Sequence, residues 1–231
     1  MNTTVIIPIH NILKRGFYRL DLSLYSLRNQ CKVIVVDSSE PGQEVWHICR
    51  NYPNVRYVPV RSSIFNKPLL HNTGVVLSDT DWVLMADADF CYQPDFITEL
   101  EVRSKTPKDF FVKLIYATGN EFPTFTVVDN WAWKNKKPFP FGREANALQY
   151  FHKEWFAQCG GYDEQMVGFG GMDNDMVNRA TLAGMNVQYI ECDSGAEVVH
   201  VWHKQEKNWN GSDMRANWKI RDNRKNIKVN D

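Results

Sequence analysis

The sequence predicts an α/β fold, a single domain built around a mainly parallel central sheet. Apolar runs typical of buried strands alternate with amphipathic segments from residue 3 to residue 87. The chain has 231 residues, 43% of them apolar, so it is long enough to bury a core. No internal repeat or low-complexity linker divides it. Such alternation is typical of a parallel sheet with helices on both faces.

The first half of the chain supplies four of the expected strands. We expect strands at residues 3–10, 31–40, 54–60 and 81–87, and helices at 18–30, 42–51 and 67–79. Ligands of such sheets bind outside the carboxyl ends of the strands. Asp37 and Asp87 both fall at strand ends, which makes that edge of the sheet the expected site.

The second half is less regular and completes a Rossmann-like domain. Residues 129–145 are rich in Trp, Lys, Pro, Phe and Gly and predict a loop, and residues 168–173 form a glycine-rich turn. We expect strands at 110–117, 124–128, 186–192 and 196–202, and helices at 153–161 and 174–185.

The composition argues against several classes of protein. Lys and Arg together number 27, as do Asp and Glu, so the zero net charge does not indicate a nucleic-acid or membrane partner. Five separated cysteines without a CxxC pair predict neither a disulfide framework nor a zinc knuckle, and favour a reducing, cytoplasmic location. No apolar run reaches the ~18–20 residues of a membrane span, and no secretory signal pattern is present.

Residues 204–231 differ from the rest, because lysine and arginine are in excess there. Such a segment could contact phosphate groups. A solvated, mobile terminus fits the same composition equally well.

Asp87 and Asp89 follow an apolar run in "VLMADADFC", residues 83–91. Residues i and i+2 of an extended chain point to the same side, so the two carboxylates could share one hard cation. Mg²⁺ and Mn²⁺ prefer oxygen ligands and leave positions for nucleotide phosphates. The alternative is a pair of solvent-facing aspartates that cap the next turn.

Two histidines stand close together in "VVHVWHK". His200, between valines on a predicted strand, could be a structural residue, although imidazole also suits Mn²⁺. His203 follows three residues later and could face a phosphate.

The glycine-rich turn leads into a predicted helix through "GFGGMDND". Glycine lets the backbone approach a ligand closely, and Asp173 would lie where the helix dipole favours a carboxylate. Asp173 could simply cap that helix, or it could act as a general base on a rigid element. Phe169 could stack on a sugar ring or pack in the core.

Six segments, taken in order, carry a family resemblance. They are "VIIPIHN", "VIVVDSSE", "FNKPLLHNTG", "ADAD", "GGYDEQMVGFGGMDND" and "HVWHK". Together they resemble the GT-A-fold nucleotide-sugar glycosyltransferases over residues 3–204. The first two segments are similar to family 2 enzymes. The other four are similar to the β-1,4-galactosyltransferases and the polypeptide N-acetylgalactosaminyltransferases.

The resemblance implies a nucleotide site on the first half of the chain. It places the end of the first strand near the base and gives Asp37 a hydrogen bond to that base, taken as uracil. Asn66, Lys67 and Asn72 would lie along the nucleotide. The donor-binding residues that it implies are Pro8, His10, Asn11, Asp37, Asn66, Lys67, Asn72, Asp87, Ala88 and His203.

The resemblance also implies a metal centre and an acceptor side. Asp89 would be a direct ligand of Mn²⁺ or Mg²⁺, His200 the second protein ligand, and Asp87 a ligand or a ribose contact. Asp173 aligns with the catalytic base of the galactosyltransferases. The implied acceptor or sugar contacts are Phe169, Gly170, Gly171, Asp175 and Trp202.

The implied activity is hexosyl transfer from a nucleotide diphosphate sugar, a UDP-sugar, to an acceptor hydroxyl with inversion. Retention is the alternative, because the N-acetylgalactosaminyltransferases carry similar blocks. A non-catalytic sugar-nucleotide-binding module is another. A nucleotidyltransferase would need a glycine-rich phosphate loop after the first strand, where only Gly16 is found. The acceptor stays open among glycan, lipid, protein, small molecule and modified nucleic-acid base.

The resemblance implies one GT-A domain over residues 1–231. Residues 1–116 would form the nucleotide-binding half, 117–203 the acceptor and catalytic half, and 204–231 a basic lid or tail over the donor.

Three departures from the family pattern stand out. Phe169 replaces a tryptophan, Met172 replaces a glutamate, and "VVDSSE" replaces the commoner "VDDGS", which leaves Asp37 alone. The first two predict an acceptor different from that of the galactosyltransferases.

Overall fold

The structure is a computed structural model that describes residues 2–15, 17–118, 136–138, 148–168, 170–192, 194–201, 203 and 211–224. The predicted strand at 124–128 and most of the predicted loop at 129–145 lie outside the described residues, as do Phe169 and Trp202.

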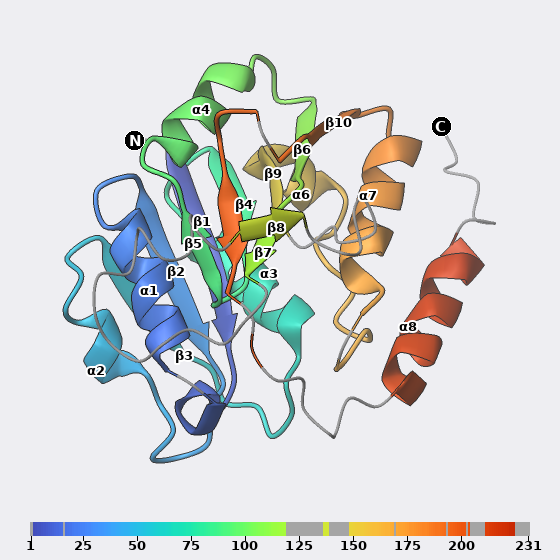
Figure 1. Cartoon of the computed structure of the whole chain (residues 1–231). Helices are drawn as coiled ribbons and strands as arrows, with labels where there is room; N and C mark the ends of the chain where they lie inside the picture. The colour runs from blue at the N-terminus through green and yellow to red at the C-terminus, as the bar shows by residue number, and fades with distance from the viewer. Residues whose placement is uncertain are drawn as a thin grey trace.

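A seven-stranded sheet runs through the centre of the molecule (Figure 1) in the order β10-β6-β9-β4-β1-β2-β3. Its strands are β1 (Thr3–Ile9), β2 (Lys32–Asp37), β3 (Val55–Pro59), β4 (Trp82–Met85), β6 (Asp109–Lys113), β9 (Gln149–His152) and β10 (Asn186–Ile190). Only β9 is antiparallel to its neighbours, β4 and β6. The predicted α/β class with a mainly parallel sheet is therefore confirmed.

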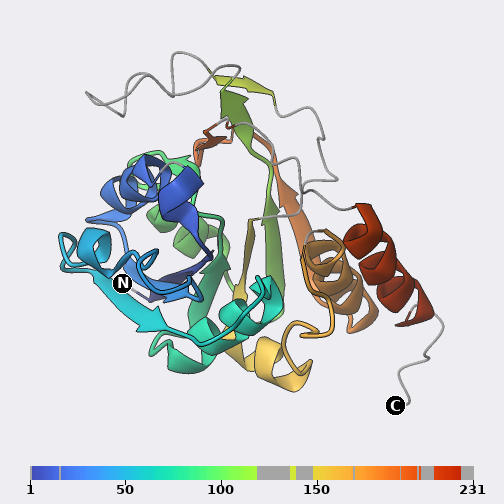
Figure 2. The ribbon, with the colours of Figure 1, turned by 90° about the horizontal axis from the view of Figure 1, so that it is seen from below.

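Helices cover both faces of this sheet (Figure 2). Along β1, Val5 and Ile7 point into one core cluster and Ile6 into the other, as strand alternation requires. One cluster takes residues of α1 (Tyr18–Leu27), α2 (Trp46–Cys49) and α4 (Phe96–Arg103). The other takes residues of α3 (Lys67–Leu77), α6 (Lys153–Gln158) and α7 (Met172–Leu182). A 3-10 turn, η1 (Ile12–Arg15), follows β1.

A smaller sheet begins at the carboxyl end of β4. Its strand order is β5-β11-β7-β8, with β5 (Phe90–Tyr92), β11 (Val198–His200), β7 (Tyr116–Thr118) and β8 (Lys136–Pro138). It brings residues that are far apart in sequence to the edge where Asp37 and Asp87 were expected.

The last described element is α8 (Gly211–Arg224), which lies along the outer side of α7 in both views (Figures 1 and 2). Ile220 packs against the same core cluster as α7. This part of the predicted tail is thus a packed helix.

The structure differs from the expected elements in identifiable places. β9 was not predicted, because four residues that include Gln149 and His152 give no clear apolar run. The predicted strand at 110–117 is divided between β6 and β7, since the chain changes sheets at Leu114. The predicted helix at 42–51 is reduced to α2, which begins at Trp46. Gly42 has a left-handed φ of 81°, which a right-handed helix cannot include. β5, α4 and α8 were not predicted, and β8 lies inside the predicted loop.

Helix α3 lies close to β1 at Gly74. A Cβ added there would be 2.3 Å from Cγ2 of Ile6. We expect Gly74→Ala to lower the free energy of unfolding by about 1–3 kcal/mol despite the better helix propensity of alanine. Urea unfolding measures this change. Val76→Ala is the matched control, since Val76 is exposed on the same helix and should change stability by less than about 0.5 kcal/mol. A Gly74→Ala protein as stable as the parent would contradict the close packing.

Across the described ranges, none of the helices has the length and apolarity that a membrane span requires.

Candidate functional site

A short antiparallel ladder creates the centre of the site. Asp89 directly precedes β5, and His200 ends β11, where it pairs with Phe90. The backbone N–H of Val201 donates to the carbonyl of Asp89 at 2.8 Å. The ladder therefore holds the chain around residue 200 against the predicted DxD pair.

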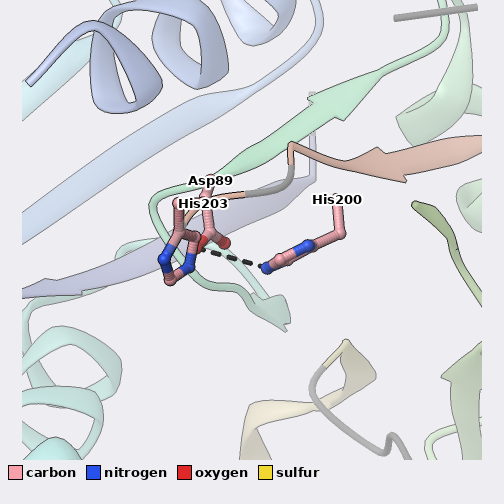
Figure 3. A group of neighbouring side chains, drawn as sticks. All are labelled: Asp89, His200 and His203. Carbon is pink, nitrogen blue, oxygen red and sulfur yellow. Dashed lines mark ion pairs between the residues drawn. The ribbon is translucent and has the colours of Figure 1, made fainter. Parts of the chain in front are cut away.

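Asp89, His200 and His203 converge at this point (Figure 3). Nε2 of His203 lies 3.1 Å from Oδ2 of Asp89, and Nε2 of His200 lies 3.4 Å from the same oxygen. One ligand atom from each residue lies within 4.8 Å of the other two. Oδ1 of Asp89 is buried and has no hydrogen-bond partner among the described residues. An unsatisfied carboxylate oxygen beside two imidazoles fits a divalent cation such as Mn²⁺.

Asp89 and His200 each shift the other's pKa towards the charged form. Burial would raise the pKa of Asp89, but His200 and His203 outweigh it and hold that pKa well below its ordinary value. Burial would likewise lower the pKa of His200, but Asp89 outweighs it and the pKa is raised. The carboxylate is therefore ionised, as a metal ligand must be.

A buried arginine stands behind the cluster. Arg19 of α1 is 6% exposed, and its Nη1 lies 3.6 Å from Oδ2 of Asp89. The guanidinium adds positive charge next to the carboxylate. Sequence reasoning missed this residue, because its only signal is a cation on the buried stripe of an amphipathic helix.

Lys67 joins two further carboxylates. Its Nζ lies 2.8 Å from Oδ1 of Asp87 and 3.5 Å from Oδ2 of Asp173. Burial alone would lower the pKa of Lys67, but Asp173 and Asp87 outweigh it and the pKa is raised. The ammonium group is thus charged and lies between the carboxylates of Asp87 and Asp173.

Asp173 lies in the first turn of α7, where the helix dipole favours a carboxylate. Its Oδ1 is buried without a hydrogen-bond partner among the described residues. Burial raises the pKa of Asp173, an effect that Lys67 partly offsets and Asp87 adds to. Nε2 of Gln149 donates to the carbonyl of Asp173 at 2.7 Å, and the hydroxyl of Tyr162 donates to Oε1 of Gln149 at 2.8 Å. A carboxylate with a raised pKa on a supported backbone is suited to proton transfer.

The predicted base-binding residues meet where β1 and β2 end. Nδ1 of His10 lies 3.1 Å from the carbonyl and from the hydroxyl of Ser38, and its ring stacks on Phe65 at 5.8 Å. The N–H of Asn11, which has a φ of 53°, donates to Oγ of Ser39 at 2.7 Å. Pro8 is buried within β1.

Asp37 forms hydrogen bonds within the protein, and its expected bond to the base stays a prediction. Its Oδ1 accepts from the N–H of Ser39 at 2.8 Å, and its Oδ2 accepts from the N–H of Val45 and the hydroxyl of Tyr57. The side chain is buried and shapes the turn after β2 through these three bonds.

Asn66 and Asn72 both contact residues 162–164. Oδ1 of Asn66 caps α3 by accepting from the N–H of Leu69, and its Nδ2 donates to the carbonyl of Glu164. Asn72 exchanges hydrogen bonds with the backbone of Tyr162. Both amides fasten α3 to residues 162–164. Ala88 lies buried in the turn between β4 and β5.

On the predicted acceptor side, Gly170 and Gly171 precede α7 with left-handed φ values of 83° and 88°. Asp175, which was predicted to contact the acceptor, is buried in α7. It is 1% exposed and pairs with Arg179, whose Nε lies 3.0 Å from Oδ2. The structure thus shows Asp175 in a structural ion pair, and the acceptor contact expected of it stays a prediction. Met172 is buried in the core.

We expect Asp175→Asn to lower the free energy of unfolding by about 1–3 kcal/mol, because Arg179 loses a charged partner, and to leave turnover unchanged. Urea unfolding and a transfer assay measure the two effects. Arg179→Gln should cost a similar amount, and the double variant less than the sum. Loss of turnover with intact stability would support the acceptor role.

The family assignment comes from the sequence profile of glycosyl transferase family 2, which matches residues 4–161, more than half of the chain. The chain belongs to glycosyl transferase family 2. A second profile, described as the N-terminal domain of galactosyltransferase, matches residues 126–204. The resemblance drawn from the six sequence segments is thereby confirmed. Comparison with curated protein sequences gives no significant match.

Solved structures share the fold of this family 2 chain. One is GalNAc-T7 with UDP, GalNAc and Mn²⁺ (TM-score 0.67, 16% identity, covering 91% of this chain and 44% of that chain). Another is a mannosyltransferase from Pyrobaculum calidifontis in complex with GDP-Man and Mn²⁺ (0.61, 18%, 96% and 60%). A third is S. aureus TarS, residues 1–349, in complex with UDP (0.67, 15%, 96% and 64%). The chain thus spans less than two thirds of the length of these proteins, and at these identities the likeness shows the GT-A fold.

Within this family 2 fold, the structure also changes the grouping of the predicted metal residues. His203, expected at a phosphate, lies nearer to Asp89 than His200 does. The family resemblance implied one histidine ligand, His200, and residues i and i+3 of a continuous strand would point to opposite faces. The strand ends at His200, so the chain is free to turn and bring both rings to the same carboxylate.

Proposed function

We propose that this family 2 chain transfers a sugar from a nucleotide diphosphate sugar to an acceptor hydroxyl. The strongest support is that two groups of side chains lie at one edge of the sheet. One is the cluster of Asp89, His200 and His203, and the other is Lys67 with Asp87 and Asp173. The first group suits a cation, and the second combines a fixed positive charge with a carboxylate of raised pKa.

Asp89, His200 and His203 would hold the divalent cation, Mn²⁺ or Mg²⁺, and Asp87 would stay with Lys67. When bound, such a cation neutralises charge on the leaving diphosphate. Two of the similar structures contain Mn²⁺, which favours this metal. Lys67 adds a fixed ammonium group, and Arg19 adds charge behind Asp89.

Asp173 would act as the general base. The acceptor hydroxyl oxygen forms a bond to the anomeric carbon, its proton passes to Oδ1 or Oδ2 of Asp173, and the carbon–oxygen bond to the diphosphate breaks with its electron pair leaving on the nucleotide. Direct displacement inverts the anomeric centre. A product with the donor's own anomeric configuration, detected by NMR, would rule out this stereochemistry.

The donor is proposed to be a UDP-sugar. Two of the similar structures contain UDP and one contains GDP-Man. The assay below therefore compares uridine and guanosine donors. His10 and Asn11 with the Ser38–Ser39 turn, where β1 and β2 end, offer the polar groups for its recognition.

The function is tested by incubating the chain with UDP-glucose, UDP-galactose, UDP-N-acetylglucosamine, UDP-N-acetylgalactosamine and GDP-mannose, with MnCl₂ or with EDTA. We expect slow, Mn²⁺-dependent hydrolysis of one UDP-sugar to free sugar and UDP. Binding without hydrolysis of any donor would indicate a non-catalytic module. In a parallel incubation with a nucleoside triphosphate and a sugar phosphate, formation of a nucleotide sugar would indicate a nucleotidyltransferase.

A further inference from the structure

The glycine-rich turn fits closely beneath α8. Gly168, Gly170 and Gly171 have left-handed φ values of 73°, 83° and 88°. A Cβ on Gly168 would lie 2.4 Å from Oδ2 of Asp213, and one on Gly170 would lie 3.0 Å from Cγ of Met214. The same glycines that allow the turn therefore also allow the helix to approach its backbone.

One buried side chain fastens the helix to the turn. Asn217 of α8 is 1% exposed, and its Nδ2 donates to the carbonyl of Val167 at 3.0 Å and to that of Gly170 at 2.8 Å. Its Cβ lies 3.0 Å from the position a Cβ of Gly171 would take. Both ends of the segment 167–170 are thus held by one amide group.

The glycine-rich turn leads directly into the first turn of α7, which carries Asp173. Gly171 is the N-cap residue of α7, and its carbonyl accepts from the N–H of Asp175 at 2.9 Å to close the first helical turn. Gln149 holds the carbonyl of Asp173 from the sheet side. Asn217 holds the turn from the α8 side, so Asp173 is supported from two directions.

We propose that α8 is a fixed brace for the turn that carries Asp173, and that Asn217 is its positioning residue. The inference rests on the proposed role of Asp173 as the base and goes beyond it by assigning a task to the C-terminal helix. In this proposal residues 211–224 form a docked helix, whereas the sequence predicted a lid or tail over the donor. Asn217 touches no reacting atom and acts through the placement of the Asp173 carboxylate.

The test compares the full chain with Asn217→Asp, which keeps the shape but places acceptor oxygens against two carbonyls, and with Asn217→Ala as a milder change. Lys219→Ala, an exposed residue of the same helix, is the control. Hydrogen–deuterium exchange should show at least about tenfold faster exchange in peptides covering 168–175 for both Asn217 variants and not for the control. Thermal unfolding checks that the variants remain folded.

A second readout separates positioning from general damage. With UDP and MnCl₂ as probes, the Kd of the Asn217 variants should match the parent, because the cation cluster lies on other elements, while kcat for donor hydrolysis falls at least about tenfold. Unchanged exchange at 168–175, or an equal loss of UDP affinity and kcat, would overturn the brace. A parent chain that hydrolyses no donor would refute the proposed function. The hydrogen–deuterium exchange measurement needs no substrate, so it would still test the brace.

Discussion

Asp89→Asn is expected to abolish cation binding and nearly all turnover. The substitution keeps the shape of the side chain but removes the charge that both histidines face at Oδ2. Loss of an outer-shell partner alone lowers metal affinity by about 10–100-fold, so loss of a direct ligand should exceed about 100-fold in Kd for Mn²⁺. Turnover should fall by about 10³-fold, since a bound cation contributes several kcal/mol to the transition state.

Two comparisons make this result specific. His203→Ala should also weaken Mn²⁺ binding, which distinguishes the three-residue cluster from a site made by Asp87 and Asp89 alone. Asp79→Asn, an exposed aspartate paired with Lys32, should leave Mn²⁺ affinity unchanged. Titration of Mn²⁺ by electron paramagnetic resonance measures all three. Wild-type affinity in His203→Ala would remove His203 from the proposed ligands.

Asp173→Asn is expected to lower kcat by about 10²–10⁴-fold, the usual contribution of a general base. The Kd values for UDP and Mn²⁺ should change little, because the ion pair with Lys67 is the contact that joins Asp173 to the predicted donor residues among the described residues. Asp175→Asn is the control on the same helix, and its turnover should match the parent. Near-normal kcat in Asp173→Asn would refute the base assignment.

The pH profile gives an independent check of the same residue. A base must be deprotonated, and burial raises the pKa of Asp173 above its ordinary value. The acidic limb of kcat/KM should therefore lie above the range of an ordinary aspartate, and activity should be lost as the pH falls through it. In Asp173→Asn this limb should disappear.

The regular half of the fold could be predicted because each buried strand carries a continuous apolar run. β1, β2 and β4 appear within the expected ranges, and the strand ends place Asp37 and Asp87 at one edge. β9 could not be predicted, because it is short and draws its stability from pairing with β4 and β6 on either side. Such non-local pairing leaves no periodic signal in the chain.

The site was predictable in its residue types and less so in its contacts. The sequence indicated five candidates that the structure brings to this edge of the sheet, but their grouping depends on side-chain partners. They are Asp87, Asp89, Asp173, His200 and His203. Lys67 forms an ion pair with Asp87, and His203, three residues beyond the end of β11, lies next to Asp89.

Other site contacts left no sequence signal. Asp175 is neutralised by Arg179 one helical turn away, and Arg19 and Asn217 are buried polar residues whose partners are distant in sequence. Burial and pairing of this kind are properties of packing.

The most direct test of the metal centre is a crystal grown with MnCl₂ and UDP and measured at the manganese absorption edge. We predict one strong anomalous peak at coordination distance from Asp89, His200 and His203, with the diphosphate of UDP on its open side and Asp87 still joined to Lys67. A peak held by Asp87 and Asp89 with both histidines turned away would contradict this account, as would UDP bound without any peak at the cluster.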